Sequence, residues 1–151
     1  MKYIIMIILG FIIDRITKVY AINNFIDNPY DGSLLNFTYL ENRGAAFGIL
    51  QDSRIFFIIL TIVIVGYLLY YFIKNYRTNM PILNLALAFI ISGALGNFYD
   101  RLLNGYVVDF IEFAFVNFPI FNFADILVTV GSILVIIYLI FFEESEKKNE
   151  R

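Results

Sequence analysis

The sequence predicts a helical membrane protein, with four transmembrane helices and a small extended platform outside the bilayer. Three observations lead to this fold class. Of the 151 residues, 60% are hydrophobic and the mean hydropathy is +0.77, whereas soluble domains contain about 45 to 50% apolar residues. Four apolar stretches are long enough to cross a hydrocarbon core about 30 Å thick. Between them lie two stretches rich in β-branched and aromatic residues.

The first predicted helix covers about residues 3–22. It follows Lys2, and its apolar beginning imitates a secretory signal peptide. However, Asp14, Arg15 and Lys18 stand where a small-residue cleavage site would be. We therefore expect a membrane helix that is retained.

The other three predicted helices cover about residues 55–73, 82–98 and 124–142. Pro81 suits the first turn of the third helix, because its missing N–H would be unpaired there in any case. With so few spans, we expect a single membrane domain over residues 1–151.

Basic residues indicate on which side of the membrane the termini lie. Arg43 and Arg54 fall in the connections on one side, and the end of the chain is a charged tail at residues 143–151. The basic residues that flank the other side are Lys2, Lys74, Arg77, Lys147, Lys148 and Arg151. Because cytoplasmic loops carry an excess of Lys and Arg, both termini are predicted to be cytoplasmic.

This orientation places two long connections outside, at about residues 23–54 and 99–123. Each contains a stretch of strand-like composition, LLNFTYLE at 34–41 and VVDFIEFAF at 107–115. We expect these stretches to form the extended platform on the outer surface.

The charge and the missing residue types exclude several kinds of function. The net charge of −2 argues against nucleic-acid binding, which requires a strongly basic surface. The chain has no cysteine and no histidine, so disulfides, thiolate catalysis and the usual zinc ligands are absent. We expect no metal and no cofactor, and carboxylates remain as the acid–base groups near neutral pH.

Five polar residues stand in apolar sequence at one depth of the predicted membrane. They are Asp14 in the first helix, Asn97 and Asp100 in the third, Asp109 in the connection that follows, and Asp125 at the start of the fourth. Ionisable side chains in such surroundings are costly and usually functional. We therefore expect a shared polar site near the outer interface.

Two charged pairs have both a structural and a functional interpretation. Asp14 and Lys18 are four residues apart, so one helix face holds them as an ion pair. That pair is either a structural clamp or a direct contact to substrate or lipid. Asp100 and Arg101 are adjacent at a helix end, where they position each other or a neighbouring loop.

The segment ENRGAAFG offers exposed backbone beside an amide side chain. Gly44, Ala45, Ala46 and Gly48 leave the backbone accessible and able to pack closely, and Asn42 is able to hydrogen-bond a peptide. The alternative interpretation is a plain tight turn.

Asp109 and Asp125 are the residues in which we expect the chemistry. Two carboxylates within hydrogen-bond reach share one proton over a broad pH range, and such a pair activates water against a peptide bond as in aspartic proteases. Alternatively, each only caps a helix or faces water, and FNFAD does place Asp125 near a helix start. A Ser–Lys dyad of Ser92 and Lys18 has no support from spacing.

Five segments, in this order and with four predicted spans, closely resemble the bacterial lipoprotein signal peptidases, which are signal peptidase II or aspartic peptidase family A8. The resemblance covers nearly the whole chain. The segments are DRITK (14–18), ENRGAAFG (41–48), GNFYDR (96–101), VVDFI (107–111) and FNFADILVTVG (121–131).

The resemblance implies a role for individual residues. Asp109 and Asp125 match the catalytic pair, and Asp14 and Lys18 match a structurally important pair. The residues assigned to substrate binding or to support of the site are Asn42, Gly44, Asn97, Asp100, Arg101 and Asn122.

The resemblance also implies a fold, a substrate and a location. The fold would be four transmembrane helices, a small extracytoplasmic β-cradle, and a mobile loop with a short helix over the site. The substrates would be prolipoproteins cut just before a cysteine that carries diacylglycerol, with inhibition by globomycin-like cyclic peptides. The protein would act as a monomer in the bacterial inner membrane, in contact with lipids, with its active site near the outer face.

Two other kinds of protein fit the composition. A small transporter or proton-conducting protein also carries buried Asp and Lys, but it would need polar residues at the midplane and in the cytoplasmic halves of the helices, where they are scarce. In a non-catalytic membrane scaffold the two aspartates would be incidental.

Overall fold

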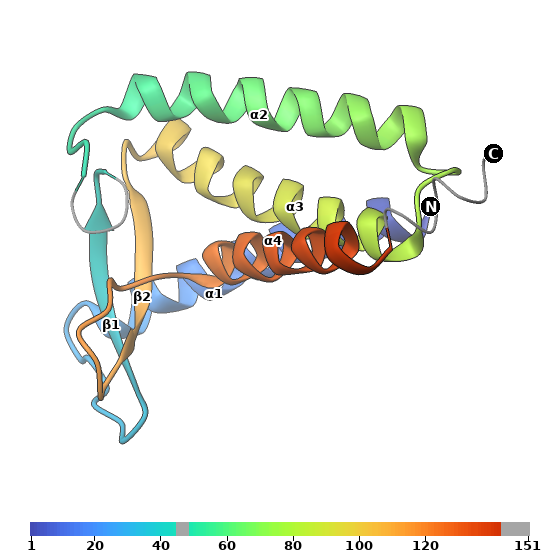
Figure 1. Cartoon of the computed structure of the whole chain (residues 1–151). Helices are drawn as coiled ribbons and strands as arrows, with labels where there is room; N and C mark the ends of the chain where they lie inside the picture. The colour runs from blue at the N-terminus through green and yellow to red at the C-terminus, as the bar shows by residue number, and fades with distance from the viewer. Residues whose placement is uncertain (45–48, 143–151) are drawn as a thin grey trace.

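The computed structural model describes residues 1–44 and 49–142. Its helices and strands are, in chain order, α1 (Lys2–Phe25), β1 (Leu35–Asn42), α2 (Arg54–Asn75), α3 (Pro81–Leu103), β2 (Val107–Phe113) and α4 (Phe123–Phe141). The helices run along one direction, and the two strands lie across one end of them (Figure 1). The N-terminus and the last turn of α4 lie at the opposite end.

Each predicted helix is present, with ends that differ by a few residues. The largest difference is in α3, which continues past the predicted end at residue 98 to Leu103. The added turn contains Asp100 and Arg101, whose polar side chains find partners inside the protein and do not need a loop exposed to water.

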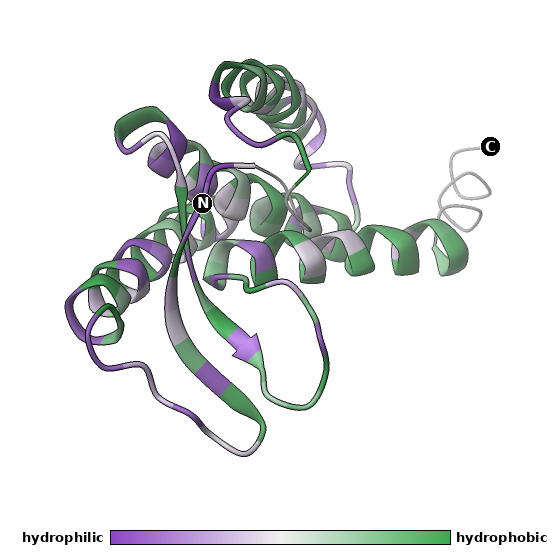
Figure 2. Cartoon of the chain, turned by 90° about the vertical axis from the view of Figure 1, so that its left-hand side faces the viewer, coloured by the Kyte–Doolittle hydropathy of each residue, from purple (hydrophilic) through white to green (hydrophobic). Residues whose placement is uncertain are grey.

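Three helices, α2, α3 and α4, are long and apolar enough to cross a membrane. They are hydrophobic along most of their length (Figure 2). The chain is thus a mostly helical, membrane-type protein with a small sheet. In α1, the charged residues Asp14, Arg15 and Lys18 lower the apolar character of the helix.

Helix α3 packs against each of the other three helices. Small residues bring α3 and α4 close together. A Cβ atom on Gly93 would collide with the carbonyl oxygen of Ala124, and one on Gly131 would lie 2.8 Å from the carbonyl oxygen of Ala86. Close backbone approach through small residues is the usual way in which membrane helices associate.

The two strands form an antiparallel sheet in which Leu35 pairs with Phe113 and Asn42 pairs with Val107. The register shifts between Phe37 and Leu40, which bends the strand. The sheet packs on the end of α1 through buried Ala21, Val108 and Phe110. The expected extended platform is therefore a two-stranded sheet, fixed to the helices by an apolar core.

Beyond β2, the chain returns to α4 along the sheet. The backbone N–H groups of Phe110 and Ile111 donate to the carbonyl oxygen of Phe121, and the N–H of Phe121 donates back to Ile111. This bridge places the start of α4 beside the strand that carries Asp109.

The connection from β1 to α2 forms turns where it is described, with positive φ at Leu50 (56°) and Asp52 (60°). Among the described residues, no short helix supplements α1 to α4. Ala45, Ala46 and Gly48, and the charged tail at 143–151, lie outside the described residues.

We predict that Gly93→Ala lowers the free energy of unfolding by about 1–3 kcal/mol, because its methyl group forces α3 and α4 apart. The matched control is Gly66→Ala on α2, where a Cβ meets no atom within 4 Å and alanine is the better helix former. Thermal unfolding in detergent measures both. Equal melting temperatures for the two variants would contradict the packing described.

Candidate active site

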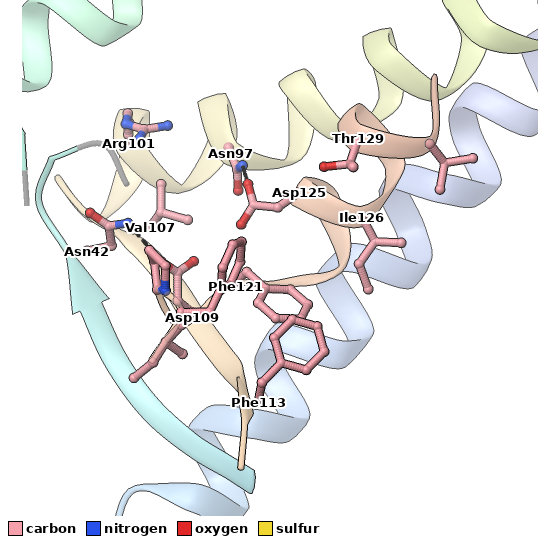
Figure 3. A pocket seen from close by; sticks show the side chains of 14 residues that line it. Asn42, Asn97, Arg101, Val107, Asp109, Phe113, Phe121, Asp125, Ile126 and Thr129 are labelled. Atoms are coloured by element: carbon pink, nitrogen blue, oxygen red, sulfur yellow. Dashed lines mark hydrogen bonds between the residues drawn. The ribbon is translucent and has the colours of Figure 1, made fainter. Parts of the chain in front are cut away.

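A cavity of about 480 Å³ lies at the sheet end of the helices, between the two strands, α3 and the start of α4 (Figure 3). Its polar lining residues are Asn42, Asn97, Arg101, Asp109 and Asp125. Its apolar walls include Val107, Phe113, Phe118, Phe121, Ile126 and Val130. The cavity therefore combines a polar floor with walls that suit an apolar ligand.

Asp109 comes from the middle of β2 and is 1% exposed. Asn42 Nδ2 donates to its Oδ2 at 2.8 Å, and Asn122 Nδ2 donates to its Oδ1. Burial, followed by the negative charge of Asp125, raises the pKa of Asp109 to about 7 against the opposing effect of the two amide hydrogen bonds. The Asp109 carboxyl neither caps a helix nor faces water.

Asp125 lies in the first turn of α4, where Asn122 is the N-cap. The Asp125 N–H donates to Asn122 Oδ1 at 3.0 Å, and the Asn122 N–H donates to Asp125 Oδ2 at 3.1 Å, which completes a capping box. The interpretation of Asp125 as a helix cap is thus correct, but it accounts for one carboxylate oxygen only. The other oxygen, Oδ1, accepts from Asn97 Nδ2 at 2.7 Å.

The two carboxyl groups point into the same cavity from separate elements (Figure 3). The amides of Asn97 and Asn122 connect them, since Asn122 Nδ2 also lies 3.2 Å from Asn97 Oδ1. All four carboxylate oxygens accept a hydrogen bond from an amide or a backbone N–H. Asp109 and Asp125 are therefore fixed in orientation before any ligand is bound.

Beneath this pair, Asp14, Arg15, Lys18 and Asp100 form a group that we call the ion cluster. Lys18 Nζ lies 3.2 Å from Asp14 and 2.8 Å from Asp100. Arg15 lies 2.6 Å from each of the same carboxylates. The predicted pairing of Asp14 with Lys18 is present, as one contact in a larger cluster that joins α1 to α3.

The ion cluster also holds the backbones that carry the two aspartates. Asp100 Oδ2 accepts from the N–H of Val108 at 3.2 Å, next to Asp109 in β2. Asp14 Oδ1 accepts from the N–H of Ala124 at 3.1 Å, next to Asp125 in α4. The positions of β2 and α4 relative to each other thus depend on the cluster.

Asp100 and Arg101 are adjacent in sequence but turn in different directions. Asp100 joins the ion cluster, whereas Arg101 Nη2 donates to the carbonyl oxygen of Gly44 at 3.0 Å. The N–H of Gly44 in turn donates to Asn42 Oδ1. Arg101 therefore ties α3 to the end of β1, where Asn42 lines the cavity.

Sequence reasoning missed two parts of the site. The first is Arg15, although it stands beside Asp14 in the segment DRITK. The second is the aromatic wall, in which the ring of Phe113 contacts those of Phe118 and Phe121. The many phenylalanines that follow Asp109 in the sequence could have indicated this aromatic wall. Among the described residues, no group of three His, Cys, Asp or Glu side chains is arranged to hold a metal.

A membrane-type helical fold with two carboxyl groups facing one cavity is the arrangement expected of a membrane aspartic peptidase. Residues 6–141 match the family described as Signal peptidase (SPase) II. The chain belongs to this signal peptidase II family and is a peptidase.

Curated relatives and solved structures agree with this assignment. The lipoprotein signal peptidase of Clostridium tetani (strain Massachusetts / E88) is 48% identical over 143 residues, which cover 91% of each chain. That of Clostridioides difficile (strain 630) is 40% identical, over 97% of this chain and 100% of its own. A bacterial membrane enzyme solved at 2.3 Å superposes with a TM-score of 0.83 at 38% identity, over 99% of this chain and 92% of its own.

We predict that Asp14→Ala destabilises the protein by about 3–5 kcal/mol, because it leaves Asp100 as the one carboxylate facing two cations and leaves the Ala124 N–H without an acceptor. We expect this loss to exceed any direct effect on turnover. Glu41→Gln is the control, since it breaks an exposed ion pair with Arg43 that contributes at most about 1 kcal/mol. Thermal unfolding measures stability, and an unchanged melting temperature with abolished turnover would refute this role for Asp14.

Proposed function

We propose that Asp109 and Asp125 are the catalytic pair of an aspartic endopeptidase that removes signal peptides from prolipoproteins. One observation carries the proposal. Two carboxyl groups from different elements, that of Asp109 buried and that of Asp125 partly buried, face one cavity, and fixed amides hold all of their oxygens. Such a pair is suited to share one proton and to bind a water molecule between its members.

The two carboxyl groups have different surroundings, which supports different roles for them. Asp125 lies at a helix N-terminus, where the helix dipole favours a negative charge. Asp109 lies on a strand, with a pKa raised to about 7. We therefore assign the general base to Asp125 and the general acid to Asp109.

In the reaction, the water oxygen forms a bond to the scissile carbonyl carbon while Asp125 takes a proton from the water. Asp109 donates its proton to the carbonyl oxygen, which produces a neutral diol intermediate. When the C–N bond breaks, the proton on Asp125 passes to the leaving nitrogen and a diol proton returns to Asp109. The pair thereby regains its original protonation state.

The walls of the cavity support a substrate that arrives from the bilayer. The apolar walls continue onto the exposed side of α4 at Ile126 and Val130. A diacylglyceryl chain held in the lipid would bring the peptide bond to the cavity as an effectively intramolecular reactant. Cleavage just before the lipidated cysteine then follows from where that chain is anchored.

The remaining polar residues of the cavity support the pair or contact the peptide. Arg101 and Gly44 are suited to contact a peptide backbone, and a globomycin-like cyclic peptide would compete for the same groups. The residues assigned to binding and support are Asn42, Gly44, Asn97, Asp100, Arg101 and Asn122. All of them come from one chain, which supports a monomer as the active form.

We also propose that α1 is a fourth transmembrane helix of a single domain that spans residues 1–151. Its 24 residues are about 36 Å long at about 1.5 Å per residue. Its charges do not oppose this placement, since Asp14 and Lys18 are buried and Arg15 pairs with two carboxylates.

The end of the molecule that carries the sheet is proposed to face outward. Lys2, Lys74 and Arg77 lie at the opposite end, as expected for the cytoplasmic side. Both termini would then be cytoplasmic in the bacterial inner membrane, and the active site would lie near the outer face. A transporter is not favoured, because the charged residues of the described helix interiors gather at the sheet end only.

We predict that Asp109→Asn and Asp125→Asn each fold but lower the cleavage rate of a diacylglyceryl prolipoprotein peptide by about 10³-fold. Either change leaves the pair without a shared proton. Glu112→Gln is the matched control on β2, since Glu112 bonds Asn36 and does not line the cavity. Near-normal turnover by either aspartate variant would show that the pair is not catalytic.

The pH profile gives a separate prediction. Because Asp109 must be protonated to act as the acid, kcat/KM should fall about tenfold per pH unit above about pH 7. At low pH the rate should fall again as Asp125 gains a proton. A peptide substrate without titrating groups in this range provides the measurement, and a constant kcat/KM from pH 7 to 9 would contradict the assignment of Asp109.

A further inference from the structure

Lys18 is a buried cation that does not contact either carboxyl group of the pair. It is 1% exposed. Its ammonium group has three donors and three acceptors around it: Asp14 Oδ2 at 3.2 Å, Asp100 Oδ2 at 2.8 Å and Asn97 Oδ1 at 2.9 Å. Two of these contacts belong to the ion cluster, and the third leads to the cavity.

The contact to Asn97 fixes which way its amide points. An ammonium group is only a donor, so the amide oxygen must face Lys18. The Asn97 NH₂ group is thereby directed at Asp125 Oδ1, to which it donates at 2.7 Å. The opposite orientation would place the NH₂ group against a cation and the oxygen against a carboxylate.

We propose that Lys18 is a positioning residue that, through Asn97, holds the negative charge of the pair on Asp125. The inference rests on the proposed function, in which Asp125 is the base. Lys18 polarises the amide of Asn97, and a polarised N–H is a better donor to an ionised carboxylate than to a protonated one. Asp109 has no corresponding relay, since the amide oxygens of its two donors, Asn42 and Asn122, accept from the backbone N–H groups of Gly44 and Asp125 and not from a cation.

Other charges near Asp125 do not provide this relay. Asp14, Arg15 and Asp100 accompany Lys18 in the ion cluster, whose four formal charges cancel. Arg101 donates to a backbone carbonyl, and Asp109 is the other member of the pair. Lys18 therefore acts on Asp125 through the hydrogen bonds of Asn97, in addition to the direct effect of its charge.

The test uses Lys18→Met, Asn97→Leu and the double variant, with full-length protein in detergent and a diacylglyceryl prolipoprotein peptide. At low pH, kcat/KM should fall as Asp125 gains a proton, and we call this part of the pH profile the acidic limb. Each single change should move the acidic limb to higher pH by about one unit, because ionised Asp125 loses the polarised N–H of Asn97 as a donor. The double variant should show the shift of one single variant and not their sum. A purely structural role for Lys18 would lower the melting temperature without moving this limb.

Folding does not limit the experiment. In Lys18→Met, Arg15 still lies 2.6 Å from both carboxylates of the ion cluster. Asn97→Leu leaves the whole cluster intact and decides the question if the Lys18 variant does not fold. Glu112→Gln is the control, since Glu112 bonds Asn36, lies outside the ion cluster and does not line the cavity, so this change should leave the acidic limb in place.

An acidic limb that stays in place in folded Asn97→Leu would overturn the proposal, as would additive shifts in the double variant. These outcomes differ from a failure of the proposed function, which appears as turnover by Asp109→Asn or Asp125→Asn. The same shift in both single variants, without addition in the double variant, supports the relay.

Discussion

A buried cluster of two carboxylates and two cations holds together the parts of the molecule that form the site. Removing ionised groups from water costs several kcal/mol for each ion, so such a cluster adds little net stability. Its effect is on arrangement, because any displacement of α1 against α3 would leave Asp100 without a cation and the two cations of α1 with one carboxylate fewer. The same carboxylates accept from the N–H groups of Val108 and Ala124. The relative positions of β2 and α4, and hence of the two aspartates, follow from this requirement.

Neutral amides separate the ion cluster from Asp109 and Asp125, the pair that we propose as catalytic. A cation in direct contact with both Asp109 and Asp125 would favour two ionised carboxylates and would remove the proton that the general acid needs. Asn42, Asn97 and Asn122 hold the carboxylate oxygens without adding charge. They fix the geometry and leave the pair able to keep one proton. The site therefore needs neutral asparagines at these positions, because a charged side chain there would disturb the proton that the two aspartates share.

The sequence was sufficient to predict the helices, both strands and the pairing of Asp14 with Lys18, because apolar runs and helical spacing are local properties. It was not sufficient to predict the partners of Arg15, since Asp100 is 85 positions away and the contact depends on how α1 is rotated against α3. For the same reason, the adjacent residues Asp100 and Arg101 gave no sign that they point to different partners. The aromatic wall depends on the path of the chain from β2 to α4, which has no periodic pattern.

The position of the cavity at the end of the helices meets two opposing requirements. Hydrolysis needs water, whereas a lipidated peptide stays in the bilayer, and both are present together only near the interface. The cavity provides a polar floor at Asp109 and Asp125 and an apolar side along α4. A deeper site would lose water, and a site above the sheet would lose the acyl chains. In the proposed function, the depth at which the ion cluster joins α1 to α3 sets which peptide bond the pair is able to reach.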